Sequence, residues 1–544
     1  MMKHKMPPAE LPSTVTIKVN DCIIVGKAQP ASEAYPKPLD LFYGLRYGQA
    51  ERSKAPVSEP LKSASGGIDA TKPKPPCPIP MAPQETSEDC LRLNIVRPSK
   101  NGNGPMPVVV YLHGGGFNFG NPLDADMAAF VARSEKDIMS VSVGYRLGAL
   151  GFGPGEEGDG ARSNLGLRDQ RVAVNWLREW IGWFGGNGED ITLMGVSAGA
   201  HSVGHHMLNP SPLPFRKAVL ESGSPTARSV LSVSHPRTQS QFKSFRHHLP
   251  SQKQTRSADD ILHASLMVWA ENMDSLAWPF QPVVDANDND SIVPDLPLKL
   301  WNQPHLPANP RAILTGFCSD EGANFMPRNP PPFRDFFATL IPTLDLDALE
   351  AVYPDPDRDP TSPYAGSKNA QLTRLADAYG HYAYICPILH TAHRASRAGL
   401  RVYLYEYAGL NGGGEDGGGG PLTSGHCAQS PLVRPDVSEI GEHPGLVEAS
   451  REMHGRWAAF AAAPEGDLGA LWPAFETPFG GGGGKGELLI FAEGNDEACG
   501  GKERGIPVRT RRLTEREMAV CRFWWDRMEL SQGMGEKGVV DKPW

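Results

Sequence analysis

Short apolar runs alternate with amphipathic stretches over most of the chain. Between the runs, apolar residues recur at every fourth position from Val172 to Phe184, which predicts one face of a helix that ends at Gly185 and Gly186. Strands that alternate with helices imply parallel pairing through crossovers, so we predict an α/β fold with a mostly parallel sheet and helices on both faces. The runs that predict buried strands are 107–113, 138–145, 191–195, 217–222, 312–316 and 401–407.

Other stretches predict a hairpin, loops and a terminal helix. Residues 14–28 alternate apolar and polar positions around a central Asn-Asp pair, as in a β-hairpin. Residues 48–86 are rich in Pro, Lys and Ser and predict a surface loop, and the glycine tracts 411–420 and 480–484 predict loop insertions. The TERE segment at 514–517 has the spacing of a capping box and predicts a helix start.

Composition and charge narrow the class of protein. The net charge of -9 and the pI near 6.0 give no reason to expect nucleic-acid binding. We find no apolar run long enough to span a membrane and no apolar signal segment near the start. The 8 cysteines form no C-x-x-C pair and no metal-like cluster. We therefore predict a cytoplasmic protein with reduced cysteines, with secretion as the alternative.

Two glycine motifs in a fixed order point to nucleophilic chemistry. Ser197 stands between Gly195 and Gly199 directly after a predicted strand, which is typical of a strained turn that exposes a serine hydroxyl. With 59 glycines in the chain, such a match arises by chance about 0.4 times, so the motif alone is weak. The HGGG segment at 113–116 also follows a predicted strand, and its backbone N–H groups can face a ligand oxygen. Together the two motifs favour a serine nucleophile with an oxyanion hole.

A serine nucleophile needs a base, and the base needs an acid to orient it. Asp320 and Glu321 follow the predicted strand 312–316, and their spacing does not decide between them. His426 lies in a loop beyond the strand 401–407, where the third member of a Ser…acid…His order belongs.

Other histidines are assigned structural roles. His201 and His205 have the i, i+4 spacing of a zinc site, but the residue after His201 is Ser202 instead of the glutamate of a metalloprotease. We therefore predict a structural role for both, and we place His390 and His393 on the surface of a helix.

At this point the chain resembles the type B carboxylesterases, the cholinesterase and lipase family of the α/β-hydrolase superfamily. The resemblance covers about residues 14–526, and it implies the α/β-hydrolase fold in a single catalytic domain over 1–544. It rests on the segments SEDCLRLNI, HGGGF, NLGLRDQRVAVNWL, FGGNGEDITLMGVSAGAHS, ESGS, FQPVVD, GFCSDEG, ICPI, YLYEY, GHCAQSPLV and LWPAF.

The resemblance also assigns roles to single residues. It implies Ser197 as nucleophile, Glu321 as the acid in preference to Asp320, and His426 as base. Ser222 matches a buried hydroxyl that supports the acid and the base. The oxyanion hole is implied to be the backbone N–H groups of Gly115, Gly116 and Ala198.

Several positions depart from the family's pattern. Val196 stands where many relatives have a glutamate, and Pro80 stands where cholinesterases have a tryptophan, so choline esters are disfavoured as substrates. Gln429 replaces the usual acidic residue after the histidine.

Two cysteine pairs fall where secreted relatives form disulfides: Cys77 with Cys90, and Cys386 with Cys521. In a reducing compartment these would be buried thiols. Trp278 and Phe280 are either pocket or core residues.

From these residues we predict a serine carboxylic-ester hydrolase that acts through an acyl-enzyme on a small or medium uncharged ester. No metal or cofactor is implied, and the oligomeric state stays open. The alternatives are a lipase, or a thioesterase or lactonase with the same triad. A non-catalytic adhesion protein is disfavoured because the chain keeps every part of the catalytic machinery.

Overall fold

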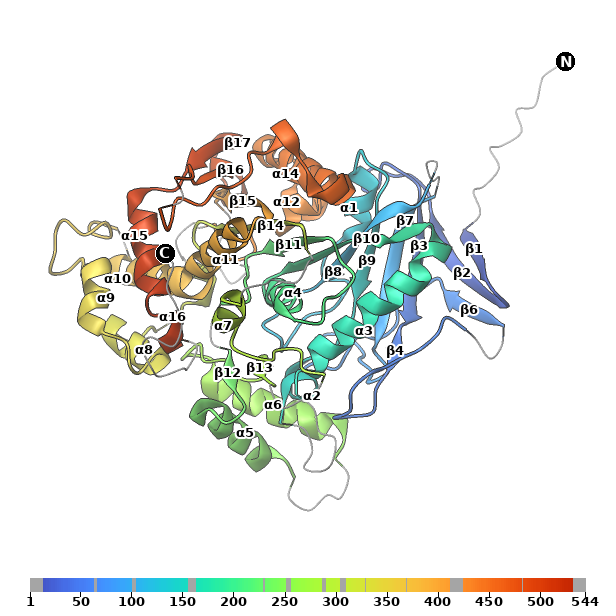
Figure 1. The fold of residues 1–544 in the computed structure, drawn as a ribbon, viewed down its shortest axis with the longest axis horizontal. Coiled ribbons are helices and arrows are strands. Elements are labelled where there is room, and N and C mark those ends of the chain that lie inside the picture. Colours follow the sequence, from blue (N-terminus) through green and yellow to red (C-terminus); the bar gives the residue numbers. More distant parts are fainter. Residues whose placement is uncertain are drawn as a thin grey trace.

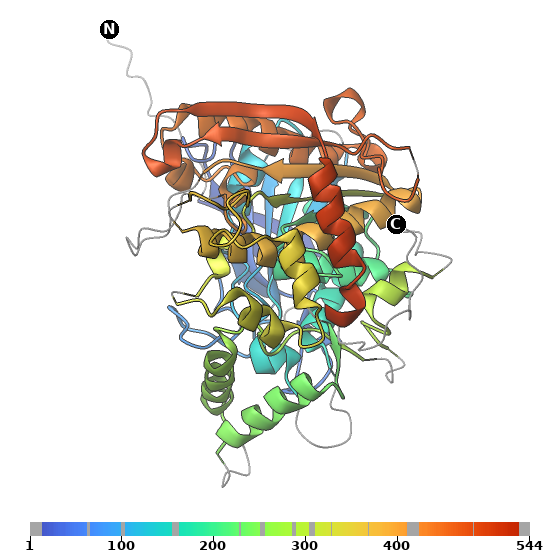
Figure 2. The ribbon, with the colours of Figure 1, turned by 90° about the vertical axis from the view of Figure 1, so that its left-hand side faces the viewer.

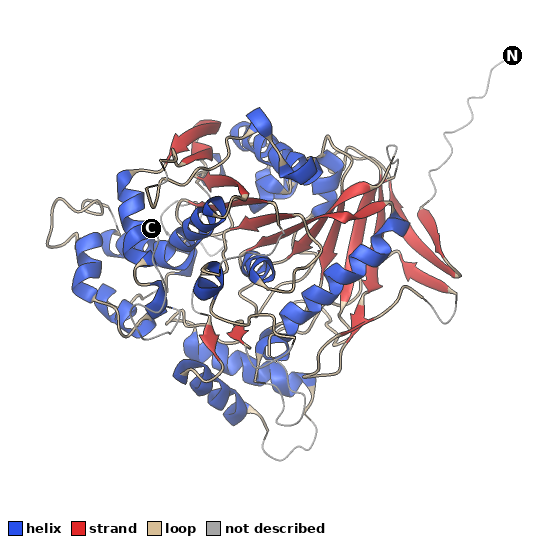
Figure 3. Ribbon diagram, viewed as in Figure 1, coloured by secondary structure: helices blue, strands red, loops and turns tan. Residues whose placement is uncertain are grey.

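The computed structural model describes residues 13–531, except 63–65, 100–103, 155–162, 228–229, 251–255, 286–289, 304–309, 328, 368, 411–423 and 482. A sheet of 13 strands runs through it, with helices on either side (Figure 3). The strands are β1 (Thr14–Val19), β2 (Cys22–Gln29), β3 (Leu39–Arg46), β6 (Gly67–Ala70), β7 (Arg92–Pro98), β8 (Met106–Leu112), β9 (Met139–Val143), β10 (Gly186–Val196), β11 (Lys217–Glu221), β14 (Ala312–Cys318), β15 (Arg401–Tyr407), β16 (Glu487–Asn495) and β17 (Arg504–Arg512).

The strand order is β1-β2-β3-β7-β9-β8-β10-β11-β14-β15-β16-β17, and β6 pairs with β2. Neighbouring strands from β9 to β16 are parallel, whereas β1, β2, β3 and β7 form antiparallel pairs at one end and β17 pairs antiparallel with β16 at the other. The predicted mostly parallel sheet and all six predicted strands are therefore confirmed, as is the leading hairpin.

The two faces of the sheet carry separate cores, as the alternation of side chains along a strand requires. In β8, Val108 and Val110 pack into one core with helix α3 (Leu165–Trp180) and helix α4 (Ala198–Leu208). Val109 points to the opposite face, where it packs with helix α1 (Met127–Arg133) and helix α14 (Pro444–Ala462). These helices accordingly cover opposite faces in Figure 1.

The remaining helices surround this frame, and two views place α5 and α6 side by side at the end far from β16 and β17 (Figures 1 and 2). The other helices are α2 (Gly148–Phe152), α5 (Pro236–His248), α6 (Ala258–Asn272), α7 (Pro297–Trp301), α8 (Phe333–Leu340), α9 (Leu346–Val352), α10 (Ala370–Gly380), α11 (Cys386–Arg397), α12 (Ser430–Val433), α13 (Val437–Ile440), α15 (Glu515–Trp525) and α16 (Met528–Ser531).

Helix boundaries agree with most of the sequence signals. The α-helical part of the predicted helix ends at Trp180, and a 3₁₀ turn continues it to Phe184 before Gly185 adopts a left-handed conformation with φ 85°. Thr514 and Glu517 form the expected capping box at the start of α15. The tract 480–484, of which residue 482 is not described, lies in the connection to β16, and the tract 411–420 lies outside the described residues.

The prediction of one surface loop over 48–86 is wrong in part. This segment contains the short strands β4 (Gly48–Gln49) and β5 (Val57–Ser58), which pair with each other. It also contains β6, whose Ile68 aligns with Ile24 of β2 in the main sheet. With only four residues, β6 offers too short a pattern to be recognised in sequence. A second small pair joins β12 (Leu231–Ser232) to β13 (Val283–Val284).

Candidate active site

The turn from β10 to α4 holds Ser197 in a strained conformation. Ser197 has φ 55° and ψ −121°, a backbone conformation that residues other than glycine rarely adopt. A Cβ built on Gly199 would lie 2.0 Å from the carbonyl oxygen of Leu112 in β8, and one built on Gly195 would lie 2.3 Å from the backbone of Gly199. Strand and helix therefore approach each other so closely that only glycine fits on either side of the serine.

The structure brings the three predicted triad residues together in one chain of hydrogen bonds. His426 Nε2 lies 2.8 Å from Ser197 Oγ, and its Nδ1 lies 2.5 Å from Glu321 Oε2. The other carboxylate oxygen of Glu321 accepts a hydrogen bond of 2.9 Å from the backbone N–H of Cys318. Glu321 is fully buried, whereas the His426 side chain is 10% exposed. This arrangement can move a proton from the serine hydroxyl to the imidazole and stabilise the resulting imidazolium.

The neighbouring carboxylate, Asp320, has a different position. Its Oδ2 accepts hydrogen bonds from the backbone N–H of Ser424 at 3.0 Å and from the Ser424 hydroxyl at 3.3 Å. A β-bridge between Asp320 and Gly425 ties the same two loops together. Asp320 thus fastens the loop that carries His426, and Glu321 is the carboxylate that contacts the imidazole. Burial raises the pKa of Asp320 above its ordinary value.

The glycine segment after β8 forms a tight turn beside the serine. A Cβ built on Gly114 would lie 3.1 Å from Ser197 Cβ. His113 is buried, and because its Nδ1 lies 2.9 Å from the Gly114 carbonyl, this nitrogen carries the proton and donates it. Burial lowers the pKa of His113 to about 4, so the ring is neutral at neutral pH. A carbonyl and the N–H of the same peptide point in opposite directions, so this bond also orients the N–H of Gly115.

Two aromatic rings that sequence reasoning missed lie against His426. The ring centroid of Tyr384 is 4.3 Å from that of His426, and the centroid of Phe325 is 5.0 Å away. Tyr384 lies on a π-helical turn, His381–Ile385, a type of irregularity that is frequent at functional sites. His426 lies in a loop, and these two rings restrict the orientations that its imidazole can adopt.

A cavity of about 1000 Å³ lies beside the site, and His426 and Glu321 are among its lining residues, whereas Ser197 is not. Gly114, Val196 and His426 line it on the catalytic side. Arg434 is the single Lys or Arg in its described lining, and this side chain is paired with Glu221. The cavity is therefore acidic, with a lining that includes the carboxyl groups of Asp124, Asp126, Asp320, Glu321, Asp377, Asp436 and Glu439.

The hydroxyl predicted to support the acid and the base is one step removed from them. Ser222 is buried, and its Oγ lies 4.0 Å from Cys318 Sγ. Cys318 in turn contacts the acid and the loop after His426. Its N–H donates to Glu321, and its thiol donates to Gln429 Oε1 at 3.0 Å. Trp278 and Phe280, which the sequence left as either pocket or core residues, both pack in hydrophobic cores and are not among the residues that line the cavity of about 1000 Å³. Trp278 also touches Gly116 of the glycine turn.

The other histidines singled out in the sequence are buried, and one prediction about them is wrong. His201 accepts a hydrogen bond from the Ser224 N–H, and no group of three or more His, Cys, Asp or Glu side chains in the described residues is arranged to hold a metal ion. His390 and His393 were predicted to lie on the surface of a helix, but both are buried in α11. Their rings contact Trp525, a residue too distant in sequence to be foreseen.

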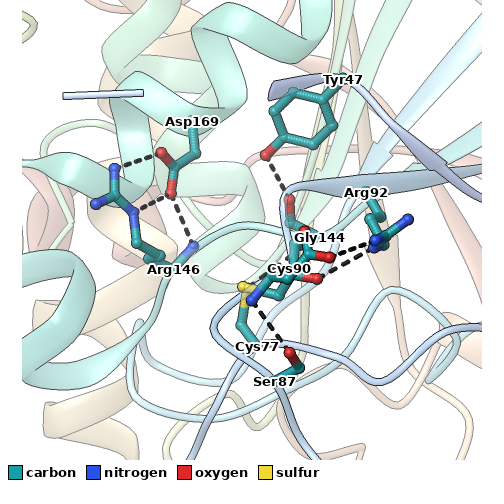
Figure 4. Close-up of a disulfide and its surroundings, with 9 residues drawn as sticks. Tyr47, Cys77, Ser87, Cys90, Arg92, Gly144, Arg146 and Asp169 are labelled. Atoms are coloured by element: carbon teal, nitrogen blue, oxygen red, sulfur yellow. Dashed lines mark hydrogen bonds and ion pairs between the residues drawn. A yellow bond between two sulfur atoms is a disulfide. The ribbon is translucent and has the colours of Figure 1, made fainter. Parts of the chain in front are cut away.

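The two predicted cysteine pairs behave differently. Cys77 and Cys90 form a disulfide beside the Arg146–Asp169 ion pair (Figure 4). Cys386 and Cys521 are buried thiols whose sulfur atoms lie 3.3 Å apart. A disulfide gives no support to the predicted reduced, cytoplasmic state. In the described part of the chain, no helix is long and apolar enough to cross a membrane.

Several known proteins are similar to this chain. The model of the carboxylesterase family matches residues 13–475. Secreted lipase 4 of Gibberella zeae is 34% identical over 363 residues, which are 60% of this chain and 62% of the lipase, so the match spans less than two thirds of that relative. An inactive carboxylesterase-like protein, VdtD of Byssochlamys spectabilis, is 27% identical over 78% of this chain and 79% of its own.

Two further similarities come from an animal enzyme and from a solved structure. Acetylcholinesterase of Bungarus fasciatus is 28% identical over 77% of this chain and 74% of its own. The solved structure of a PNB esterase superposes with a TM-score of 0.70 at 22% identity, over 93% of this chain and 99% of that one. At this identity the likeness demonstrates a shared fold.

Proposed function

Because the chain belongs to the carboxylesterase family, we propose that it is a serine carboxylic-ester hydrolase that forms an acyl-enzyme on Ser197. The observation that carries the proposal is the chain of hydrogen bonds from Ser197 through His426 to Glu321, at the wall of a large cavity. Family membership alone would not suffice, because a relative of this chain is described as inactive.

The proposed reaction uses groups that are already within hydrogen-bond reach. Ser197 Oγ attacks the ester carbonyl while His426 Nε2 accepts its proton, and Glu321 stabilises the imidazolium. The backbone N–H groups of Gly115, Gly116 and Ala198 bind the oxyanion, since they belong to the glycine turn and to the first residue of α4. His426 then protonates the leaving alcohol, and water releases the acid by the same steps in reverse order.

The surroundings of His426 support an assignment of the two halves of the substrate. The leaving oxygen must receive its proton from His426, which lines the cavity, so the alcohol part occupies the cavity. Trp278 packs against Gly116 at the other side of the turn, where a built Cβ would lie 2.7 Å from its ring. A ring at this place leaves little room for the acyl part, and this favours short acyl groups over the long chains of a lipase substrate.

The charge of the cavity supports an uncharged substrate and opposes an anionic one. Its carboxyl groups outnumber its one paired arginine, so they repel substrates that carry a carboxylate. We expect 4-carboxyphenyl acetate, which carries its carboxylate on the alcohol part, to react at least tenfold more slowly than phenyl acetate at low ionic strength, and the gap to narrow in 0.5 M NaCl.

The deciding experiment is a series of p-nitrophenyl esters from acetate to palmitate with the purified wild type, Ser197→Ala, His426→Ala and the double variant. Each single change should lower kcat on the order of 10⁴–10⁶-fold, and the double variant should lose little more, because the triad acts as a unit. A rate maximum at long chains would instead support a lipase. A thioester or a lactone preferred over every oxygen ester of similar size would support the thioesterase or lactonase. Turnover that does not depend on Ser197 would refute the proposal.

We also propose that the protein forms one catalytic domain and works in an oxidising compartment, as a secreted protein does. The Cys77–Cys90 disulfide supports this location, and a relative is named as a secreted lipase. In denatured, unreduced protein we expect 6 of the 8 cysteines to react with a thiol reagent. Eight reactive thiols would contradict the proposed location.

A further inference from the structure

Two side-chain amides connect the glycine turn of the site to the segment that carries Trp278. Asn118 Nδ2 donates to the Gly116 carbonyl at 2.8 Å and to the Pro279 carbonyl at 3.0 Å. Gln281 Nε2 donates to the same two carbonyls, at 2.9 Å and 3.1 Å. We call this pair, Asn118 and Gln281, the amide clamp.

The clamp acts on a backbone that has no side chains of its own to fix it. Gly115 and Gly116 have φ values of 107° and 60°, in the region where glycine is favoured. The Gly115 carbonyl accepts the backbone N–H groups of Asn118 and Phe119 at 3.0 Å and 2.9 Å. The next carbonyl, that of Gly116, is held by the amide clamp.

Holding these carbonyls has a direct consequence for the N–H groups. Within one planar peptide the N–H points opposite to the C=O, so a fixed carbonyl also fixes its N–H. The bonds to the Gly115 carbonyl orient the N–H of Gly116. The clamp then fixes the following peptide, so it closes the turn at its far end and limits the rotation of Gly116 about both of its backbone bonds.

We propose that Asn118 and Gln281 are positioning residues for the oxyanion hole. The inference rests on the proposed ester hydrolysis, since it assumes that Gly115 and Gly116 bind the oxyanion. Neither amide touches the reacting atoms. Each amide supplies one hydrogen to each carbonyl, so either residue alone can keep the turn attached to Pro279. The two residues are therefore redundant, and this redundancy distinguishes a clamp from two independent packing contacts.

The test is a double-mutant cycle of Asn118→Leu, Gln281→Met and the double variant, with kcat and KM measured on a short-chain p-nitrophenyl ester. Each single change should lower kcat less than about fivefold. The double change should lower it about 100-fold, as for the loss of one oxyanion donor, with KM unchanged. Ki for a trifluoromethyl ketone, which forms a tetrahedral adduct, should rise in parallel with the fall in kcat/KM.

Three results would overturn the clamp. These are a double variant as active as the wild type, losses that multiply as for independent residues, or a loss that appears in KM alone. If the double variant does not fold, Gln281→Glu takes its place. It has nearly the same shape, but its carboxylate would face the carbonyl oxygens of Gly116 and Pro279 and repel them, so it should lower kcat more than the neutral Gln281→Met does. Equal rates for these two variants would contradict the proposal. The wild type and Ser197→Ala are assayed alongside, so that absence of Ser197-dependent turnover refutes the proposed function and not the clamp.

Discussion

A buried ion pair behind the nucleophile offers a sharp test of what stabilises this site. Glu221 ends β11 and is fully buried, and the Arg434 side chain is 3% exposed. Arg434 Nη1 donates to Glu221 Oε2 at 2.9 Å, and Trp457 Nε1 donates to the other carboxylate oxygen at 2.8 Å. The backbone carbonyl of Glu221 accepts the N–H of Ser197 at 2.9 Å. The perturbation is Arg434→Met, which keeps the volume of the side chain but removes its charge.

The magnitude follows from the geometry of the pair. Two unit charges 2.9 Å apart attract by about 6 kcal/mol at an effective dielectric constant of about 20. Desolvation of the two ions offsets most of this attraction, so the intact pair contributes little. Arg434→Met leaves the Glu221 carboxylate buried without its cation, which should cost about 3–5 kcal/mol. Adding Glu221→Gln removes that charge and keeps an acceptor for Trp457, so the double variant should recover most of the loss.

The assay is urea denaturation of the wild type, Glu221→Gln, Arg434→Met and the double variant, followed by tryptophan fluorescence. The free energy of unfolding of Arg434→Met should fall by the stated amount, and that of the double variant should lie within about 2 kcal/mol of the wild type. The reasoning is refuted if Arg434→Met costs less than 1 kcal/mol, or if the two single losses simply add. Because Glu221 contacts Ser197 through its backbone, kcat of the folded double variant should stay within a few-fold of the wild type.

Three further predictions concern the acid, the disulfide and the buried histidines. Glu321→Gln should lower kcat about 10⁴-fold on a short-chain ester, whereas Asp320→Asn should lower it less than tenfold, and the reverse order would exchange their roles. Cys77→Ser should lower the free energy of unfolding by about 3 kcal/mol, as expected for a closed loop of about 14 residues, and the wild type in reductant should melt like this variant. Burial lowers the pKa of five histidines to about 4, or to about 3 for His206, below the value of about 6.5 of an unfolded chain. Between pH 6.5 and 4 the unfolded state therefore binds more protons than the folded state. The free energy of unfolding keeps its full value above this window and falls as the pH falls through it, by about 1.4 kcal/mol per histidine and pH unit. The free energy of unfolding, measured at pH 7, 6 and 5, should show that several protons are taken up on unfolding, and His454→Gln should reduce this number by one. A free energy of unfolding that does not change with pH would contradict the neutral state of these rings. The five histidines are His113, His205, His206, His393 and His454.

The sheet and its helices were predictable because their signals are local. A strand buried on both faces, such as 107–113, is a continuous apolar run, and an amphipathic helix such as α3 repeats its apolar positions with the helical period. The capping box of α15 lies within four residues. In each case the residues that decide the structure are neighbours in the chain.

The wrong and missing predictions concern partners that are distant in sequence. The polar face expected for His390 and His393 is buried because Trp525, at the far end of the chain, packs against it. The rings on His426 were missed because nothing local marks Tyr384 as a neighbour of a loop 42 residues further on. Such contacts depend on how the layers pack, and periodicity carries no information about that packing.

The order of the strands explains why the site itself could be assembled from separate motifs. The glycine turn follows β8, Ser197 follows β10, Glu321 follows β14, and the loop of His426 comes after β15. In the sheet these strands lie in the order β8-β10-β11-β14-β15 and are parallel, so their carboxyl ends meet at one edge. Strand order can thus bring together residues as distant in sequence as Ser197 and His426, but it does not set the orientation of a peptide in a glycine turn. That last step depends on side chains such as Asn118 and Gln281, which belong to neither the triad nor the sheet.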